Sequence, residues 1–216
     1  MAKLRLKFSK TGKAVWISHL DLMRTMQRAL MRAEIPLEYS FGFNPHAVMS
    51  IAMPLSVGMS SECELMDFGV SGYMEPETIA AQLNAALPEG VEALEVYEGT
   101  EKFNGIKYLR FEARLEYASG DFCGELRDLL GAPSLVIEKK TKRGLNPTDI
   151  APFIVKNALK IELTDVGALL SGILSVPDVS PAHLIQAIKQ LRPELAPEAV
   201  MISRREMLRA DFSVFR

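Results

Sequence analysis

Residues 3–32 read KLRLKFSKTGKAVWISHLDLMRTMQRALMR, and this stretch predicts a strand followed by a helix. Residues 3–8 alternate basic with apolar side chains, the pattern of a strand with one buried and one solvent-exposed face. The exposed face is expected to be wholly cationic. Ser18 is the expected N-cap of the helix, with Asp21 three residues later as in a capping box. The helix is expected to run from His19 to about Arg32, with apolar residues at helical spacing on one side.

Charge is unevenly distributed along the first hundred residues. Residues 1–32 carry eight Lys and Arg against one acid, whereas residues 33–101 carry twelve acids and no Lys or Arg. The net charge of -2 for the whole chain conceals this division. A cationic face on a nearly neutral protein is typical of proteins that bind a polyanion such as RNA.

The order of the expected elements predicts an α+β protein of two ferredoxin-like (β-α-β-β-α-β) units with antiparallel sheets. The first unit, residues 1–100, is expected to contain a second helix that begins near Pro76 and ends before Pro88. Its further extended segments are expected at 37–43, 49–57, 63–70 and 91–97. A second unit, residues 105–216, is expected to repeat this order, with the basic residues 139–144 in a loop.

Composition places the chain among globular proteins of the reducing cytoplasm. Its 216 residues are 48% hydrophobic, which is enough for a core in each of two small domains. The longest stretch without Lys, Arg, Asp or Glu, residues 39–61, is interrupted by Pro45, Pro54 and Gly58, so no membrane-spanning helix is expected. The N-terminus has no apolar run of signal-peptide length. Two lone cysteines, Cys63 and Cys123, fit a cytoplasmic protein better than a disulfide framework.

Four ordered motifs, followed by residues 142–149, strongly resemble the bacterial radical-SAM-linked domain of unknown function. The motifs are KLRLKFSK at 3–10, SHLDLMR at 18–24, YSFGFNPH at 39–46 and PLSVG at 54–58. In that family the domain occurs alone or fused behind a cobalamin-type radical SAM protein, often encoded near ribonuclease and ribosomal protein genes. The resemblance implies a place in RNA metabolism beside a radical SAM enzyme, and it implies no particular reaction.

Two clusters of basic residues are the candidates for contacts with RNA phosphates, because each neutralised phosphate releases counterions and adds affinity. For any single Lys, a solvated surface without a ligand is the favoured interpretation. The first cluster comes from the first strand, turn and helix and consists of Lys3, Arg5, Lys7, Lys10, Lys13, Arg24, Arg28 and Arg32. The second surrounds Gly144 and consists of Lys139, Lys140, Lys142 and Arg143.

An aromatic row follows the first helix. Tyr39, Phe41 and Phe43 are candidates for a platform on which unpaired bases stack. The alternative is the buried face of a strand, and the sequence favours burial. Asn44 and Pro45 are expected to form the turn after this row.

Two histidines lie within the matching motifs. His19 and His46 are candidates for the acid and base of an RNA cleavage reaction, or for metal ligands together with Asp21 or Cys63. The favoured alternative is structural, with one histidine at a helix start and the other bonded to backbone after a turn, because the pair has no spacing signature.

The chain lacks several motifs that would indicate catalysis. It has no cysteine trio for a radical SAM cluster, no glycine-rich phosphate loop, and no HExxH or GxSxG sequence, so no cofactor or metal is expected. The leading hypothesis is a non-catalytic RNA-binding accessory protein that acts beside a radical SAM enzyme in tRNA or rRNA modification or processing. One alternative is a metal-independent endoribonuclease that uses His19 and His46. The other is a protein-interaction module whose acidic residues 33–101 dock the radical SAM partner.

Overall fold

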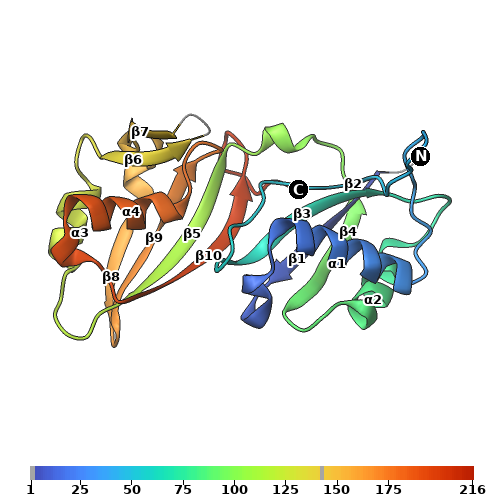
Figure 1. The fold of residues 1–216 in the computed structure, drawn as a ribbon, viewed down its shortest axis with the longest axis horizontal. Coiled ribbons are helices and arrows are strands. Elements are labelled where there is room, and N and C mark those ends of the chain that lie inside the picture. The colour runs from blue at the N-terminus through green and yellow to red at the C-terminus, as the bar shows by residue number, and fades with distance from the viewer. Residues whose placement is uncertain (1–2, 142–143) are drawn as a thin grey trace. The chain divides into compact units, whose positions relative to one another are not determined.

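The structure is a computed structural model that describes residues 3–141 and 144–216. The chain divides into two compact units, one ending at Gly105 and including Arg216, the other spanning Ile106–Phe215. The architecture is mixed α+β, with four α-helices among the described residues (Figure 1). None of these helices is long and apolar enough to cross a membrane.

Unit 1 is a four-stranded sheet with two helices on one face (Figure 1). Its strands lie in the order β4-β1-β3-β2, and every pair is antiparallel. The elements are β1 (Lys3–Lys10), η1 (Gly12–Trp16), α1 (His19–Arg32), β2 (Met49–Ile51), β3 (Ser60–Gly69), α2 (Pro76–Ala86), β4 (Val91–Glu98) and η2 (Phe103–Gly105). The predicted helix is confirmed at both ends. Ser18 is its N-cap, with Oγ accepting a hydrogen bond from the backbone N–H of Asp21 at 3.2 Å.

The core of unit 1 lies between the helices and the sheet. Because β1 alternates, Leu6 and Phe8 face the helices and are fully buried. Met26 of α1 and Leu83 of α2 are also fully buried in this core. Burying each such side chain stabilises the fold by about 1.5–3 kcal/mol, which holds both helices against the strands.

The opposite side of β1 differs from the sequence prediction. Arg5 is fully buried, so the prediction that Lys3, Arg5 and Lys7 form a wholly exposed cationic face is wrong. The segment after β4 covers Arg5: its Nη2 donates to the carbonyl of Glu101 at 2.6 Å, and its guanidinium carbon lies 4.5 Å from the centre of the Phe103 ring. Its carboxylate partner is Asp67 of β3, at 2.7 Å from Nε to Oδ1. Of this face of β1, only Lys3 is exposed, and Lys7 is half-buried.

The extended segment predicted at residues 37–43 is also corrected. Only two isolated bridges form there, Leu37 with Val70 and Tyr39 with Ala47, and the residues between bend into a loop. Gly42 has a φ of 126°, which side chains with a Cβ rarely adopt, and Asn44-Pro45 turns the chain back. The next predicted strand, 49–57, shortens to β2.

The main strands of unit 2 pair antiparallel in the order β10-β5-β9-β8, and β6 and β7 form a separate hairpin. Without the hairpin, its order of elements and strands repeats that of unit 1. Of the basic residues 139–144, predicted as a loop, Lys139 and Lys140 belong instead to β6 and Gly144 begins β7, while Lys142 and Arg143 lie outside the described residues. Its elements are β5 (Tyr108–Glu116), α3 (Cys123–Leu130), β6 (Val136–Thr141), β7 (Gly144–Asp149), β8 (Lys160–Thr164), β9 (Gly167–Ser175), α4 (Pro181–Leu191) and β10 (Ala199–Leu208).

Candidate nucleic-acid interface

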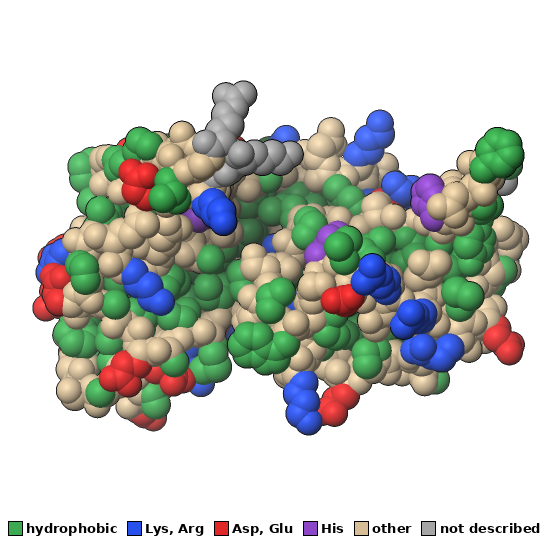
Figure 2. Space-filling model, viewed as in Figure 1, with side chains coloured by type: hydrophobic (Ala, Val, Ile, Leu, Met, Phe, Trp, Pro, Cys, Tyr) green, Lys and Arg blue, Asp and Glu red, His purple; other side chains and the backbone are tan. Residues whose placement is uncertain are grey.

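Helix α1 carries an exposed row of arginines on the side away from the core. Arg24, Arg28 and Arg32 recur every four residues, which places successive guanidinium groups about 6 Å apart along the helix. Figure 2 shows Lys and Arg side chains gathered over this helix. Arg28 forms no hydrogen bond or ion pair with any described residue. We call these three residues the arginine row.

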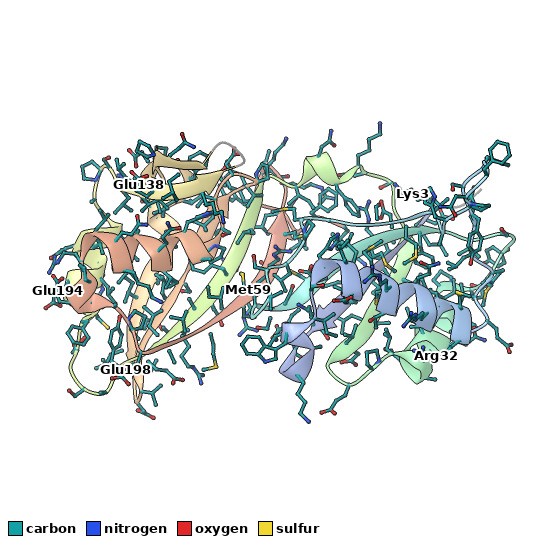
Figure 3. All side chains as sticks on the ribbon, viewed as in Figure 1. Lys3, Arg32, Met59, Glu138, Glu194 and Glu198 are labelled. Atoms are coloured by element: carbon teal, nitrogen blue, oxygen red, sulfur yellow. The ribbon has the colours of Figure 1, made fainter. Side chains whose placement is uncertain are left out.

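The two ends of the arginine row make weak surface contacts. Arg24 lies 3.0 Å from Asp21, Nη1 to Oδ1, and both side chains are exposed. Arg32, labelled in Figure 3, donates from Nη2 to the carbonyl of Ala86 at 2.6 Å. An exposed ion pair is worth about 0–1 kcal/mol, so exchange for a phosphate partner costs little. The guanidinium groups of the row are therefore accessible to an anionic ligand.

The basic residues of β1 contribute less than predicted. Lys3 is exposed, but its Nζ lies 2.9 Å from Oδ2 of Asp67. Lys7 is half-buried. Lys10 is buried, its Nζ donates to the carbonyl of Val15 at 3.1 Å, and burial lowers the pKa of its ammonium. With Arg5 also buried, the cationic surface of unit 1 comes from α1 and from exposed Lys13 rather than from the strand.

The aromatic residues are exposed, so the favoured prediction of a buried strand face is wrong. Tyr39 is 42% exposed, Phe41 97% and Phe43 112%. They belong to a loop at residues 39–47, which we call the aromatic loop, and Asn44 is exposed within it. The reason is local: this segment protrudes from the sheet edge, so its alternating rings have no second layer to pack against.

Hydrogen bonds across its base hold the aromatic loop closed. The backbone N–H of Ser40 donates to the carbonyl of His46 at 2.8 Å, and the N–H of His46 donates to the hydroxyl of Ser40 at 3.1 Å. The Ser40 hydroxyl also lies 2.8 Å from Nδ1 of the His46 ring. The loop therefore presents its rings on a defined stem, at less entropic cost than a disordered segment.

The two candidate histidines have different surroundings. His46 is exposed, and its ring contacts the side-chain hydroxyl of Ser40 rather than the backbone group that the structural interpretation predicted. His19 begins α1, and its Nδ1 is buried without a hydrogen-bond partner among the described residues. Within the described part of the chain, no group of three or more His, Cys, Asp and Glu side chains is placed to hold a metal.

A cavity of about 260 Å³ lies at the base of the aromatic loop. The stem residue Glu38 donates its backbone N–H to the carbonyl of Gly69 at 2.9 Å, and Gly69 in turn donates to the carbonyl of Val48 at 3.0 Å. The cavity is lined by Lys3, Glu38, Val48, Met49, Ser50, Asp67, Phe68 and Gly69. Apart from Lys3, none of these was predicted as a site residue. Glu38 is the acid of the 37–43 segment, but its meeting with Gly69 depends on strand register, which the local sequence does not determine.

The second basic cluster is only partly described. Lys139 is half-buried, and its ammonium donates to the backbone carbonyl of Asp178. Lys140 is exposed on β6. Lys142 and Arg143 lie outside the described residues. Of this cluster, Lys140 is the described residue most accessible to a ligand.

His183 near Lys139 gives unit 2 a predicted pH dependence. Its Nδ1 accepts the backbone N–H of Ser180 at 3.0 Å, and burial, followed by the positive charge of Lys139, lowers the pKa of the ring. Between that pKa and the unfolded value of about 6.5, the unfolded chain binds more protons. We therefore expect the free energy of unfolding to fall as the pH drops through this window. Urea unfolding at neutral and mildly acidic pH measures this change in the free energy of unfolding. A His183→Asn variant that shows the same pH dependence as the wild type would contradict its assignment to His183.

Together, the fold and the site define a mixed α+β protein whose first unit presents an arginine row and a protruding aromatic loop. The chain belongs to the bacterial family described as "Uncharacterized protein conserved in bacteria (DUF2344)", whose model matches residues 3–181. No curated protein matches the sequence. Among solved structures, the chain is similar to an unknown protein from Galdieria sulphuraria, at 13% identity over 94% of this chain and 96% of the other, with a TM-score of 0.27. A likeness this low supports no conclusion about fold or function.

Proposed function

We propose that this protein binds RNA through the arginine row and the aromatic loop and positions that RNA for a radical SAM partner. The observation that carries the proposal is the near-complete exposure of Phe41 and Phe43. Exposed rings of this kind cost hydrophobic free energy unless a partner covers them, and in RNA-binding proteins the partner is an unpaired base. The arginine row supplies the charge that such a ligand requires.

The two parts of this surface are joined by a short connection. The arginine row ends at Arg32 and the aromatic loop begins at Tyr39, so seven residues of chain limit their separation to about 25 Å. The connection is ordered: the backbone N–H of Ile35 donates to the carbonyl of Leu30 at 3.1 Å. One RNA segment of several nucleotides spans such a distance.

We interpret both units, from their strand order, as ferredoxin-like, which is the arrangement expected from the sequence.

Binding through the arginine row predicts a salt-dependent loss of affinity on mutation. Arg28→Gln is expected to weaken binding of total tRNA several-fold and to reduce the slope of log affinity against log salt by about 0.7–0.9. Titrations at several salt concentrations measure both quantities. Arg114→Gln, which removes an exposed arginine from β5 of unit 2, is the matched control and is expected to change neither. Absence of salt-dependent RNA binding by the folded wild-type protein would overturn the proposal.

The proposed radical SAM partner rests on the ordered motifs of residues 3–58. Those motifs resemble a domain that occurs alone or fused behind radical SAM proteins, and the proposed partner acts on the RNA that this domain holds. Co-purification from the native host, with and without ribonuclease treatment, tests this step. Association that survives ribonuclease indicates direct protein contact, and loss of association indicates that RNA joins the two proteins.

A metal-independent endoribonuclease is the second candidate function. It is favoured by the position of His46, whose exposed imidazole lies in the same loop as Phe41 and Phe43. The test is incubation of labelled RNA with the wild type and with His46→Ala and His19→Ala. Cleavage that is equal in all three proteins, or absent from the wild type, excludes a histidine mechanism.

A further inference from the structure

The cavity at the base of the aromatic loop has the features of a site for one nucleobase, and this inference rests on the proposed RNA-binding function. Glu38 and Val48 belong to the two sides of the loop stem and also line the cavity. An RNA strand stacked on the aromatic loop would therefore pass its entrance. Most of the remaining lining comes from β2 and β3. These two strands pair with each other, and Ser50 lies opposite Asp67 in their register.

The size of the cavity fits one base. Its volume of about 260 Å³ lies just below the range of about 300–1,000 Å³ for sites that hold drug-sized ligands, which suits a smaller ring. Val48, Met49 and Phe68 supply apolar walls, and Lys3, Glu38, Ser50 and Asp67 supply polar groups that can fix the orientation of a ring.

The charges around the cavity balance, which favours an uncharged ring over a phosphate. The Asp67 carboxylate is held by Arg5, with Nη2 3.1 Å from Oδ2 in addition to the Nε contact, and by the ammonium of Lys3. The remaining carboxylate, that of Glu38, has no hydrogen bond or ion pair from any described residue. The lining therefore has one positive group, Lys3, and two negative groups, Glu38 and Asp67. Arg5 does not line the cavity but supplies a second positive charge through its contact with Asp67, so only the Glu38 carboxylate lacks donors among the described residues.

Gly69 has no side chain, and this allows the carboxylate of Glu38 to lie against the backbone of β3 where both residues line the cavity. A Cβ at Gly69 would lie 2.5 Å from Oε2 and 2.8 Å from Cβ of Glu38, so only glycine allows this approach. A half-buried carboxylate with no donors is satisfied best by two adjacent N–H groups, because it accepts bidentately. Among the RNA bases, guanine presents such a pair, N1–H and the N2 amino group, and its O6 accepts from an ammonium or a hydroxyl.

We infer that this cavity binds one unpaired guanine of the RNA. Glu38 accepts from N1–H and from the N2 amino group, while Lys3 or Ser50 donates to O6. The rings of the aromatic loop stack on the neighbouring nucleotides. The protein thereby selects single-stranded RNA with a guanine at one position and does not depend on a duplex.

The test compares short single-stranded RNAs that differ at one base. The probes are oligouridylates of about eight nucleotides with one central U, A, C, G or inosine, a length typical of single-strand binding sites. One bidentate contact is worth about 1–3 kcal/mol, so the guanine probe is expected to bind about tenfold more tightly than the uridine, adenine and cytosine probes. Inosine keeps N1–H and O6 but lacks the N2 amino group, and it is expected to fall between guanine and the other bases.

A matched pair of variants assigns the preference to the cavity. Glu38→Gln is expected to reduce the preference for guanine to less than threefold, because the amide cannot accept at both atoms. Glu34→Gln removes the same charge from an exposed residue that does not line the cavity, and it is expected to retain the full preference.

The outcomes separate this inference from the function on which it rests. Equal binding of all five probes by the wild type overturns the guanine site and leaves RNA binding in place. A preference for guanine that is unchanged in Glu38→Gln or equal for inosine also overturns it. If no probe and no tRNA binds, the proposed function fails, and the guanine site fails with it. The inosine comparison needs no variant, so it stands even if Glu38→Gln fails to fold.

Discussion

Replacing Arg5 with Met is expected to lower the free energy of unfolding by about 3–5 kcal/mol. The substitution removes the buried partner of Asp67, which is only 2% exposed and would keep, among the described residues, only the contact with the exposed ammonium of Lys3. It also leaves the carbonyl of Glu101 without its donor and removes the cation from the Phe103 ring. Because a small domain is stable by about 5–15 kcal/mol, this is a large fraction of the total. Urea unfolding followed by circular dichroism measures the change.

Lys3→Met is the matched control for this prediction. Lys3 contacts the same carboxylate at 2.9 Å, but its side chain is 58% exposed, so its removal is expected to cost no more than about 1 kcal/mol. Arg5→Lys keeps the charge and loses the second hydrogen bond to Asp67, so an intermediate cost is expected. Equal destabilisation by Arg5→Met and Lys3→Met would show that burial of the Arg5–Asp67 pair contributes nothing to stability.

The sequence predicts α1 well because its determinants are local. Ser18 caps a helix whose apolar residues recur every three or four positions, and both features lie within fifteen residues of one another. The arginine row follows from the same periodicity: a helix that buries Met26 and Leu30 must expose residues on the other side. This part of the candidate site was therefore predictable.

The position of Arg5 was not predictable from local pattern. Alternation in residues 3–8 indicates two different faces, but it does not indicate what covers the second face. The covering residues, Glu101 and Phe103, lie nearly a hundred positions away, and the partner Asp67 lies 62 positions away. The excess of acids in residues 33–101 was the available signal, since a buried guanidinium requires a carboxylate from elsewhere in the chain.

The aromatic loop shows the opposite error, in which alternation indicates a strand that does not form. Residues 37–43 alternate as a buried strand does, yet only Leu37 and Tyr39 form bridges. Gly42 and Pro45, both recognisable in the sequence, favour a loop over a strand. Weighing them above the alternation would have predicted exposure of Phe41 and Phe43, and with it the stacking surface.

Removing both exposed rings separates binding from stability. The double variant Phe41→Ala/Phe43→Ala is expected to unfold within about 0.5 kcal/mol of the wild type, because neither ring is buried. Stacking on one ring is worth about 1–3 kcal/mol per base, so affinity for single-stranded RNA is expected to fall at least about tenfold. Fluorescence anisotropy with a labelled oligonucleotide measures the affinity, and the same protein preparation supplies the unfolding curve.

Tyr73→Ala is the control for this double variant, because Tyr73 is 79% exposed but lies outside the aromatic loop. Its loss is expected to leave RNA affinity unchanged. The salt dependence provides an independent check: ring removal lowers affinity at every salt concentration by a similar factor, whereas Arg28→Gln changes the slope. A double variant that binds RNA as tightly as the wild type would remove the stacking role. RNA binding would then rest on the arginine row alone, and the partner of the exposed rings would have to be sought among proteins.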